Sequence, residues 1–148
     1  MNLYYYDFPR LPDDMIEEVY KSLKGVDIYP YPLDEYQSFA ATQPLQEYTK
    51  NLFDFSHNTL VQIIKDNLGL HKDLGRKRAY NYIIEPGGDN VLTCWHDEEK
   101  NLIESHCINV HRWHKLNVDV FHSVENVTRP RISITINDKA EMPPELQW

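Results

Sequence analysis

Cysteine and basic residues are both scarce in this sequence of 148 residues, and each shortage excludes a class of protein. Two cysteines, Cys94 and Cys107, are too few for a disulfide framework or a four-thiolate zinc site. They leave open one bridge across a hairpin centred near Lys100, or two reduced thiols as a cytosolic protein would carry. Fifteen Lys and Arg against 23 Asp and Glu give a net charge of −8. This charge argues against a nucleic-acid partner, because basic residues supply most non-specific affinity for phosphates.

Long apolar runs are also absent, and so are glycine-rich and proline-rich tracts. A membrane helix needs roughly 18 or more consecutive apolar residues, and no segment approaches that length. The first ten residues, MNLYYYDFPR, lack the basic-then-apolar order of a signal peptide. The expectation is a cytoplasmic protein with no membrane partner, folded as a single domain over 1–148.

The N-terminal part, 1–70, is predicted to be a mainly helical cover with an opening strand in 1–8. Apolar residues recur at helical spacing within LPDDMIEEVYKSLKG, 11–25, whose final glycine is a helix stop. Prolines interrupt 26–36, which is therefore expected to be a loop or an edge. The segment 43–70 is predicted to hold one or two further helices.

From residue 71 onward the sequence changes to short runs rich in β-branched and aromatic residues, separated by turn signals such as PGGDN. With no helix between them, such strands form an antiparallel sandwich or barrel. The predicted fold class is therefore α+β, with a jelly-roll-like β core over 71–137, N-terminal helices packed on one sheet and an irregular tail at 138–148. The predicted strands are 78–84, 90–95, 102–110, 115–121 and 131–137.

Three residues form a candidate metal site. His71 and Asp73 are two positions apart, so on extended backbone their side chains point to the same side. His122, placed at the end of the strand that contains VDVF, could supply a third ligand. Two histidines and one carboxylate make the facial triad that is typical of non-haem Fe(II) oxygenases. The alternative for His71 and Asp73 is a polar loop that caps a helix or turn.

A candidate anion site follows in FHSVENVTRPRISITI, 121–136, which has the appearance of a hairpin. Arg131 and Ser133 are two positions apart on the last predicted strand and point the same way. A planar guanidinium beside a hydroxyl suits the binding of a carboxylate. Arg129 competes for this role, but Pro130 separates it from Arg131, which leads the strand and is the better candidate.

The order of these parts resembles the Fe(II)/2-oxoglutarate-dependent oxygenase superfamily, whose members carry His-x-Asp, a distal His and then an Arg on the next strand of a double-stranded β-helix. The match covers 71 to about 137, nearly half of the chain. The segments HKDLGRKRAYNYII, PGGDN, WHDE and HKLNVDVFHSVENVTRPRISI are especially similar to the small oxygenases of bacterial and marine phage genomes.

The resemblance implies that His71, Asp73 and His122 bind Fe(II). It also implies that Arg131, assisted by Ser133, pairs with the distal carboxylate of 2-oxoglutarate as co-substrate. The activity implied is hydroxylation of a C–H bond with release of succinate and CO2. The substrate would be a small molecule or a protein side chain, and no catalytic residue beyond the metal ligands is required.

Tyr80, Asn81 and Tyr82 lie on the strand after His-x-Asp, where members of this superfamily often place co-substrate contacts. Side chains alternate along a strand, so Tyr80 and Tyr82 share one face while Asn81 takes the other. Only one of these two sets can face a pocket, and the sequence leaves that choice open.

Three of the remaining histidines have two interpretations each. His96 precedes the acidic run 97–99 and belongs either to a second metal cluster or to a solvated acidic turn. His111 and His114 flank Trp113 and either line a substrate entrance or have structural roles.

Two other functions compete with the oxygenase. A cupin-like metal protein would have the same architecture without 2-oxoglutarate chemistry, and it would not need Arg131 and Ser133. A non-enzymatic structural or binding jelly roll would need none of the four ionisable site residues. The oligomeric state is open.

Overall fold

The structure, a computed structural model, describes residues 1–23 and 36–141, and the side chain of Tyr36 lies outside the described part. Ten strands and two α-helices form in this part of the chain, followed by one short 3-10 helix. In chain order they are β1 Leu3–Tyr5, α1 Asp13–Ser22, β2 Tyr36–Ala40, α2 Gln43–Leu52, β3 His57–Ile64, β4 Leu68–His71, β5 Arg78–Pro86, β6 Leu92–His96, β7 Leu102–His106, β8 Trp113–Asn117, β9 Phe121–Glu125, β10 Arg131–Asp138 and the 3-10 helix Lys139–Glu141.

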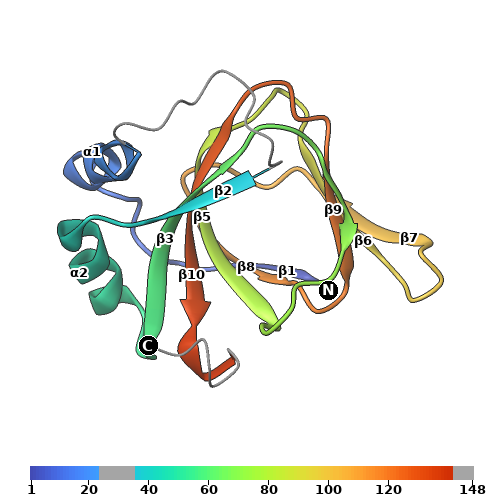
Figure 1. The fold of residues 1–148 in the computed structure, drawn as a ribbon, viewed down its shortest axis with the longest axis horizontal. Coiled ribbons are helices and arrows are strands. Elements are labelled where there is room, and N and C mark those ends of the chain that lie inside the picture. Colours follow the sequence, from blue (N-terminus) through green and yellow to red (C-terminus); the bar gives the residue numbers. More distant parts are fainter. Residues whose placement is uncertain (24–35, 142–148) are drawn as a thin grey trace.

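The strands form two antiparallel sheets that face each other (Figure 1). The six-stranded sheet has the order β1-β8-β5-β10-β3-β2, and the four-stranded sheet has the order β4-β9-β6-β7. From β3 to β10 the chain passes repeatedly from one sheet to the other, and only β6 and β7 are consecutive in the same sheet. This winding is that of a double-stranded β-helix, a cupin-type jelly roll, so the predicted fold class is confirmed.

The two helices pack on the outer face of the six-stranded sheet, away from β9, β6 and β7 (Figure 1). The alternation of side chains along β10 creates this core. Ile132, Ile134 and Ile136 point outward and are buried with Val19 of α1 and Leu45 of α2. The odd-numbered residues of β10 point the opposite way, toward the space between the sheets. One strand therefore builds the apolar core with one face and a polar pocket with the other.

The prediction for 43–70 is wrong in part. The helix α2 ends at Leu52, and β3 and β4 follow it, so this segment belongs largely to the β structure rather than to a helical cover. The run LVQII, 60–64, lies in β3 between β10 and β2. A short apolar run in a central strand has no period-two pattern that distinguishes it from a buried helix. The predicted helix stop at Gly25 and most of the predicted loop 26–36 lie outside the described residues.

The prediction of one strand at 115–121 and of a hairpin at 121–136 is also wrong. The strand β8 ends at Asn117 and β9 begins at Phe121, so the predicted strand spans a turn. His122 is the second residue of β9, which lies in the four-stranded sheet, whereas β10 lies in the six-stranded one. The segment 126–130 crosses between the sheets and brings β9 and β10 to opposite walls of the space between them.

Both cysteines are free thiols, Cys94 buried in β6 and Cys107 exposed after β7. Cys94 lies opposite Ser105 in the β6–β7 hairpin, so the possible bridge to Cys107 is not formed. Neither of the helices that the structure describes has the length and apolar character needed to cross a bilayer.

Gly87, which follows β5, is held close to the start of β10. Its φ is +86°, and a Cβ atom built on it would lie 2.7 Å from the Cβ of Arg131. Replacement of Gly87 by alanine therefore combines a left-handed backbone penalty with an overlap that β10 must relieve by moving. We expect the free energy of unfolding to fall by about 2–4 kcal/mol, measured by urea denaturation.

Gly69 provides the matched control, because a Cβ built there meets no atom within 4 Å. Gly69→Ala should change the free energy of unfolding by less than about 1 kcal/mol. Equal stability losses in the two variants would contradict the role assigned to the close approach at Gly87.

Candidate metal centre

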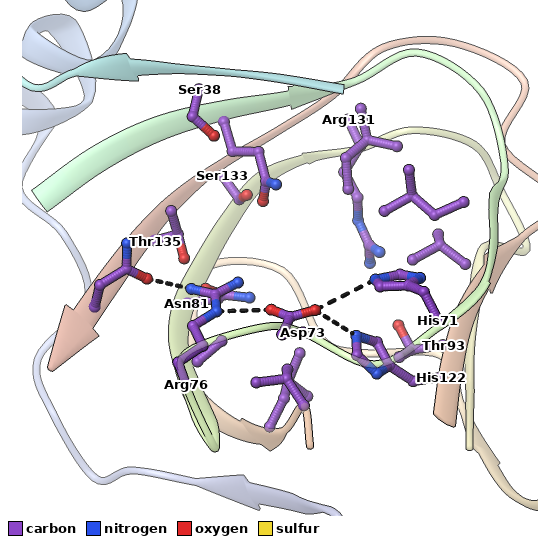
Figure 2. A pocket seen from close by; sticks show the side chains of 18 of the residues that line it. Ser38, His71, Asp73, Arg76, Asn81, Thr93, His122, Arg131, Ser133 and Thr135 are labelled. Carbon is purple, nitrogen blue, oxygen red and sulfur yellow. Dashed lines mark hydrogen bonds and ion pairs between the residues drawn. The ribbon is translucent and has the colours of Figure 1, made fainter. Parts of the chain in front are cut away.

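A pocket of about 770 Å³ lies between the two sheets (Figure 2). Its wall on the six-stranded sheet carries a polar strip, and its wall on the four-stranded sheet carries histidine. A pocket of this volume is within the range of small-molecule sites. The polar residues that line it are Ser38, Gln62, His71, Lys72, Asp73, Arg76, Asn81, Thr93, His114, His122, Arg131, Ser133, Thr135 and Asn137.

His71, Asp73 and His122 come together on one side of this pocket. His71 is the last residue of β4 and pairs across the strands with His122 of β9. Asp73 follows two residues later, and its backbone N–H donates to the carbonyl of Val118 at 2.8 Å. The Nε2 atoms of both histidines lie 3.3 Å from Oδ1 of Asp73. One ligand atom from each of the three residues lies within 4.8 Å of the other two, so the group could hold a metal ion.

The backbone fixes the orientation of both imidazoles. Nδ1 of His71 lies 2.6 Å from the carbonyl of Gly69, and Nδ1 of His122 lies 2.7 Å from the carbonyl of Val120. A carbonyl can only accept, so each Nδ1 carries the proton, and a neutral ring then has its lone pair on Nε2. Metal-binding histidines are oriented in this way. Two imidazole nitrogens and a carboxylate oxygen aimed at one point fit a divalent transition metal that keeps open positions.

Arg76 contacts the other oxygen of Asp73, and Asn137 in turn contacts Arg76. Gly75 has a φ of +81°, and the turn that it allows brings Arg76 back onto Asp73, with Nε 2.7 Å from Oδ2. Asn137, at the end of β10, accepts a hydrogen bond from Nη1 of Arg76 through its Oδ1. Figure 2 shows Asp73 between Arg76 on one side and the two imidazoles on the other. The two oxygens of the carboxylate thus have different contacts, since Oδ2 accepts from Arg76 and Oδ1 faces the two histidines.

The ionised form of Asp73 is strongly favoured. Burial raises the pKa of this carboxyl, but the close contacts with His122 and His71 and the charge of Arg76 outweigh burial. The pKa of Asp73 therefore lies well below its usual range. At neutral pH the site offers a permanent negative charge, as a cation site requires.

Arg131, the first residue of β10, points into the pocket although its side chain is almost fully buried, with 5% of its surface exposed. Among residues 1–23 and 36–141 it has no ion-pair partner, and its Nε has no hydrogen-bond partner. Burial lowers the pKa of Arg131 to about 10. A buried guanidinium without a counter-charge is costly, and a bound anion would relieve that cost.

Ser133 and Asn81 also face the pocket, whereas Tyr80 and Tyr82 do not. The two tyrosines lie on the opposite face of β5, in the core under the helices, where the hydroxyl of Tyr82 accepts a hydrogen bond from the backbone N–H of Leu11 at 3.0 Å. Strand alternation thus leaves Asn81 alone of the three predicted co-substrate contacts in position. Tyr80 and Tyr82 cannot touch a molecule in this pocket.

His114 of β8 lines the same pocket and is fully buried, which the sequence left as one of two alternatives. Burial, together with the positive charge of Arg131, lowers the pKa of His114 to about 4. The alternation of Trp113 into the core and His114 into the pocket could have been read from the sequence only if the start of β8 had been known. His96 ends β6, and no metal cluster forms around it in the described chain.

The low pKa of His114 predicts acid sensitivity of the metal-free protein. In the unfolded chain this ring binds a proton below pH 6.5, whereas in the folded chain it remains neutral down to about pH 4. The titration of His114 therefore does not reduce the free energy of unfolding above pH 6.5, and it reduces this free energy by about 3 kcal/mol as the pH drops to about 4. His114→Leu should flatten the plot of unfolding free energy against pH in that interval, measured by urea denaturation with EDTA. Parallel plots for the two proteins would contradict the assignment.

No family model and no curated protein matches the chain. Solved structures do match at low sequence identity, and three of them illustrate the range. An oxalate decarboxylase from Lactobacillus farciminis, in a formate complex, is 9% identical, with a TM-score of 0.48 over 76% of this chain and 31% of that one. A 2OG-Fe(II) oxygenase family oxidoreductase from Burkholderia pseudomallei is 13% identical, with a TM-score of 0.42 over 65% and 51%. Cobalt-bound HppE in complex with substrate is 16% identical, with a TM-score of 0.45 over 76% and 58%.

These matches concern the fold only. The chain spans between about a third and somewhat more than half of each of these three structures, and the identities are too low to carry an activity across. Function is therefore argued from the side chains of the pocket.

Proposed function

We propose that this protein is an Fe(II)- and 2-oxoglutarate-dependent oxygenase that hydroxylates a C–H bond of its substrate. The observation that carries the proposal is Arg131, a buried cation that has no ion-pair partner among the described residues and lies in the same pocket as a two-histidine, one-carboxylate triad. A metal protein without an anionic co-substrate would have no need to bury this charge. A 2-oxo acid with a distal carboxylate could bind the metal through its oxo acid end and pair with Arg131 through the distal carboxylate.

Each of the five residues has one task in the proposed site. His71, Asp73 and His122 would hold Fe(II) and leave part of its coordination sphere open. Arg131 would pair with the distal carboxylate of 2-oxoglutarate, and the hydroxyl of Ser133, on the same face of β10, would donate to the same group. The iron, with 2-oxoglutarate and O2, would supply the oxidising chemistry, and no protein nucleophile or acid–base pair would be required.

The protein's own contribution is to position these groups and to exclude water. Apolar side chains from both sheets lie between the polar groups of the pocket, among them Ile64, Ile83, Leu116 and Val124. Arg76 restrains Asp73 so that only Oδ1 is directed to the histidines. Rigid placement on strands favours precise geometry. With about 770 Å³ the pocket has room for a substrate as well as the co-substrate.

The proposal is tested by adding Fe(II) and 2-oxoglutarate to the protein without oxygen. Chelation of the iron by the 2-oxo acid should produce a weak visible charge-transfer band that saturates with 2-oxoglutarate. Succinate in place of 2-oxoglutarate is the control, because it lacks the oxo group and should give no band. Iron binding without the band would favour a cupin-like metal protein, and failure to bind iron at all would favour a non-enzymatic jelly roll.

A further inference from the structure

Three polar side chains form a row across the floor of the pocket. His114 of β8, Asn81 of β5 and Thr135 of β10 are direct cross-strand neighbours, because Asn81 pairs with both of the others in the register of the sheet. All three line the pocket. Within the described residues, Nε2 of His114, Oδ1 of Asn81 and Oγ1 of Thr135 are buried without a hydrogen-bond partner. Buried polar atoms are almost always hydrogen-bonded, so three neighbouring exceptions indicate that a bound molecule supplies their hydrogen-bond partners.

The hydrogen-bonding character of His114 follows from its surroundings. Its Nδ1 lies 3.2 Å from the carbonyl of Arg112, which can only accept, so Nδ1 carries the proton. The ring is fully buried and its pKa is lowered to about 4, so it is neutral at physiological pH. Nε2 therefore presents a lone pair and requires a donor. The amide oxygen of Asn81 is an acceptor beside it, whereas the hydroxyl of Thr135 can donate or accept.

The proposed co-substrate cannot satisfy this row. Ionised 2-oxoglutarate has only acceptor atoms, so it has no proton to give to Nε2 of His114 or to Oδ1 of Asn81. A cationic donor is disfavoured as well, because the positive charge of Arg131 acts on His114. The group that would bind to these three side chains is thus uncharged and carries N–H or O–H donors.

We propose that the row of His114, Asn81 and Thr135 binds a primary carboxamide on the primary substrate. The two N–H bonds of a carboxamide can point to the acceptors on β8 and β5, while its carbonyl accepts from the hydroxyl of Thr135. A carboxamide carries both kinds of atom in one planar group, which matches two acceptors and one donor on adjacent strands. The inference deepens the proposed function, since the shared pocket would place the carboxamide-bearing molecule beside the metal triad.

The test uses protein with ¹⁵N-labelled histidine, loaded with Zn(II) and 2-oxoglutarate so that no turnover occurs. The probes are acetamide, N,N-dimethylacetamide, which has no N–H donor, and acetate. Acetamide should shift the Nε2 resonance of His114 in a saturable manner, and the other two probes should not. Thr135→Val and Asn81→Leu should each weaken acetamide binding by about tenfold or more. Thr93→Val is the matched control, because Thr93 is equally buried in the same pocket but on β6 of the opposite sheet.

Three results would overturn the proposal: a proton on Nε2 of His114 at neutral pH, equal responses to acetamide and N,N-dimethylacetamide, or no response to any probe, which would mean that water fills the row. Binding of 2-oxoglutarate is measured separately in the same samples. Saturable acetamide binding without 2-oxoglutarate binding would reject the oxygenase and retain the carboxamide site. The reverse result would retain the oxygenase and reject this substrate class.

Discussion

Replacement of Asp73 by alanine is expected to lower the affinity for Fe(II) by more than about 100-fold, since loss of a group that only orients a ligand already costs about 10–100-fold. Among the described residues that line the pocket, this carboxylate is the only negative charge, and its Oδ1 faces both imidazoles at 3.3 Å. Without it, two neutral nitrogen ligands remain beside Arg76. Anaerobic calorimetric titration with Fe(II), or absorption with Co(II), measures the change.

Asp89→Ala is the matched control, because that side chain is 96% exposed and carries the same charge. It should leave the metal affinity within about twofold of the unmodified protein, as screening weakens the effect of a distant surface charge. A thermal melt of each metal-free variant separates lost binding from lost folding. Unchanged iron affinity in a folded Asp73→Ala protein would show that the metal, if bound, lies elsewhere.

The sequence predicted that His71, Asp73 and His122 lie together because part of the signal is local and chemical. His71 and Asp73 are two residues apart in the sequence, so only the third residue, His122, comes from a distant segment. His122 pairs with His71 in the register of β4 and β9, which no local pattern specifies. The order of the motifs within the resemblance supplied that long-range contact.

The parts that the sequence did not predict depend on tertiary structure. In the run 60–64, Val61 and Ile63 face the core while Leu60 and Ile64 face the pocket, so apolar residues lie on both faces of β3 and hydrophobicity does not alternate along it. The choice between Asn81 and the neighbouring tyrosines required the position of the helices, which cover one face of the sheet only. The contact of Arg76 with Asn137 joins residues 61 positions apart, and no spacing rule predicts it.

Replacement of Arg131 by methionine is expected to weaken the binding of 2-oxoglutarate by about 2–5 kcal/mol, which is roughly 30-fold or more in affinity. The guanidinium is the buried positive charge of the pocket that lacks an ion-pair partner in the described chain, so no neighbour can replace it. Its removal should leave iron affinity nearly unchanged, because the triad is held by Arg76 and the backbone instead. Titration of the anaerobic charge-transfer band measures co-substrate affinity, and calorimetry measures iron affinity.

Arg131→Met should also raise, or at least not lower, the stability of the metal-free protein. Methionine fills much of the same space without the desolvation cost that lowers the pKa of the arginine to about 10. Arg129→Met is the matched control, since that residue stands two positions earlier, is half exposed and pairs with Asp89 at 3.4 Å. It should change neither co-substrate affinity nor stability appreciably. A residue that destabilises the metal-free protein but is required for co-substrate binding has a functional rather than a structural role. Unchanged 2-oxoglutarate affinity in Arg131→Met would therefore remove the observation on which the oxygenase proposal rests.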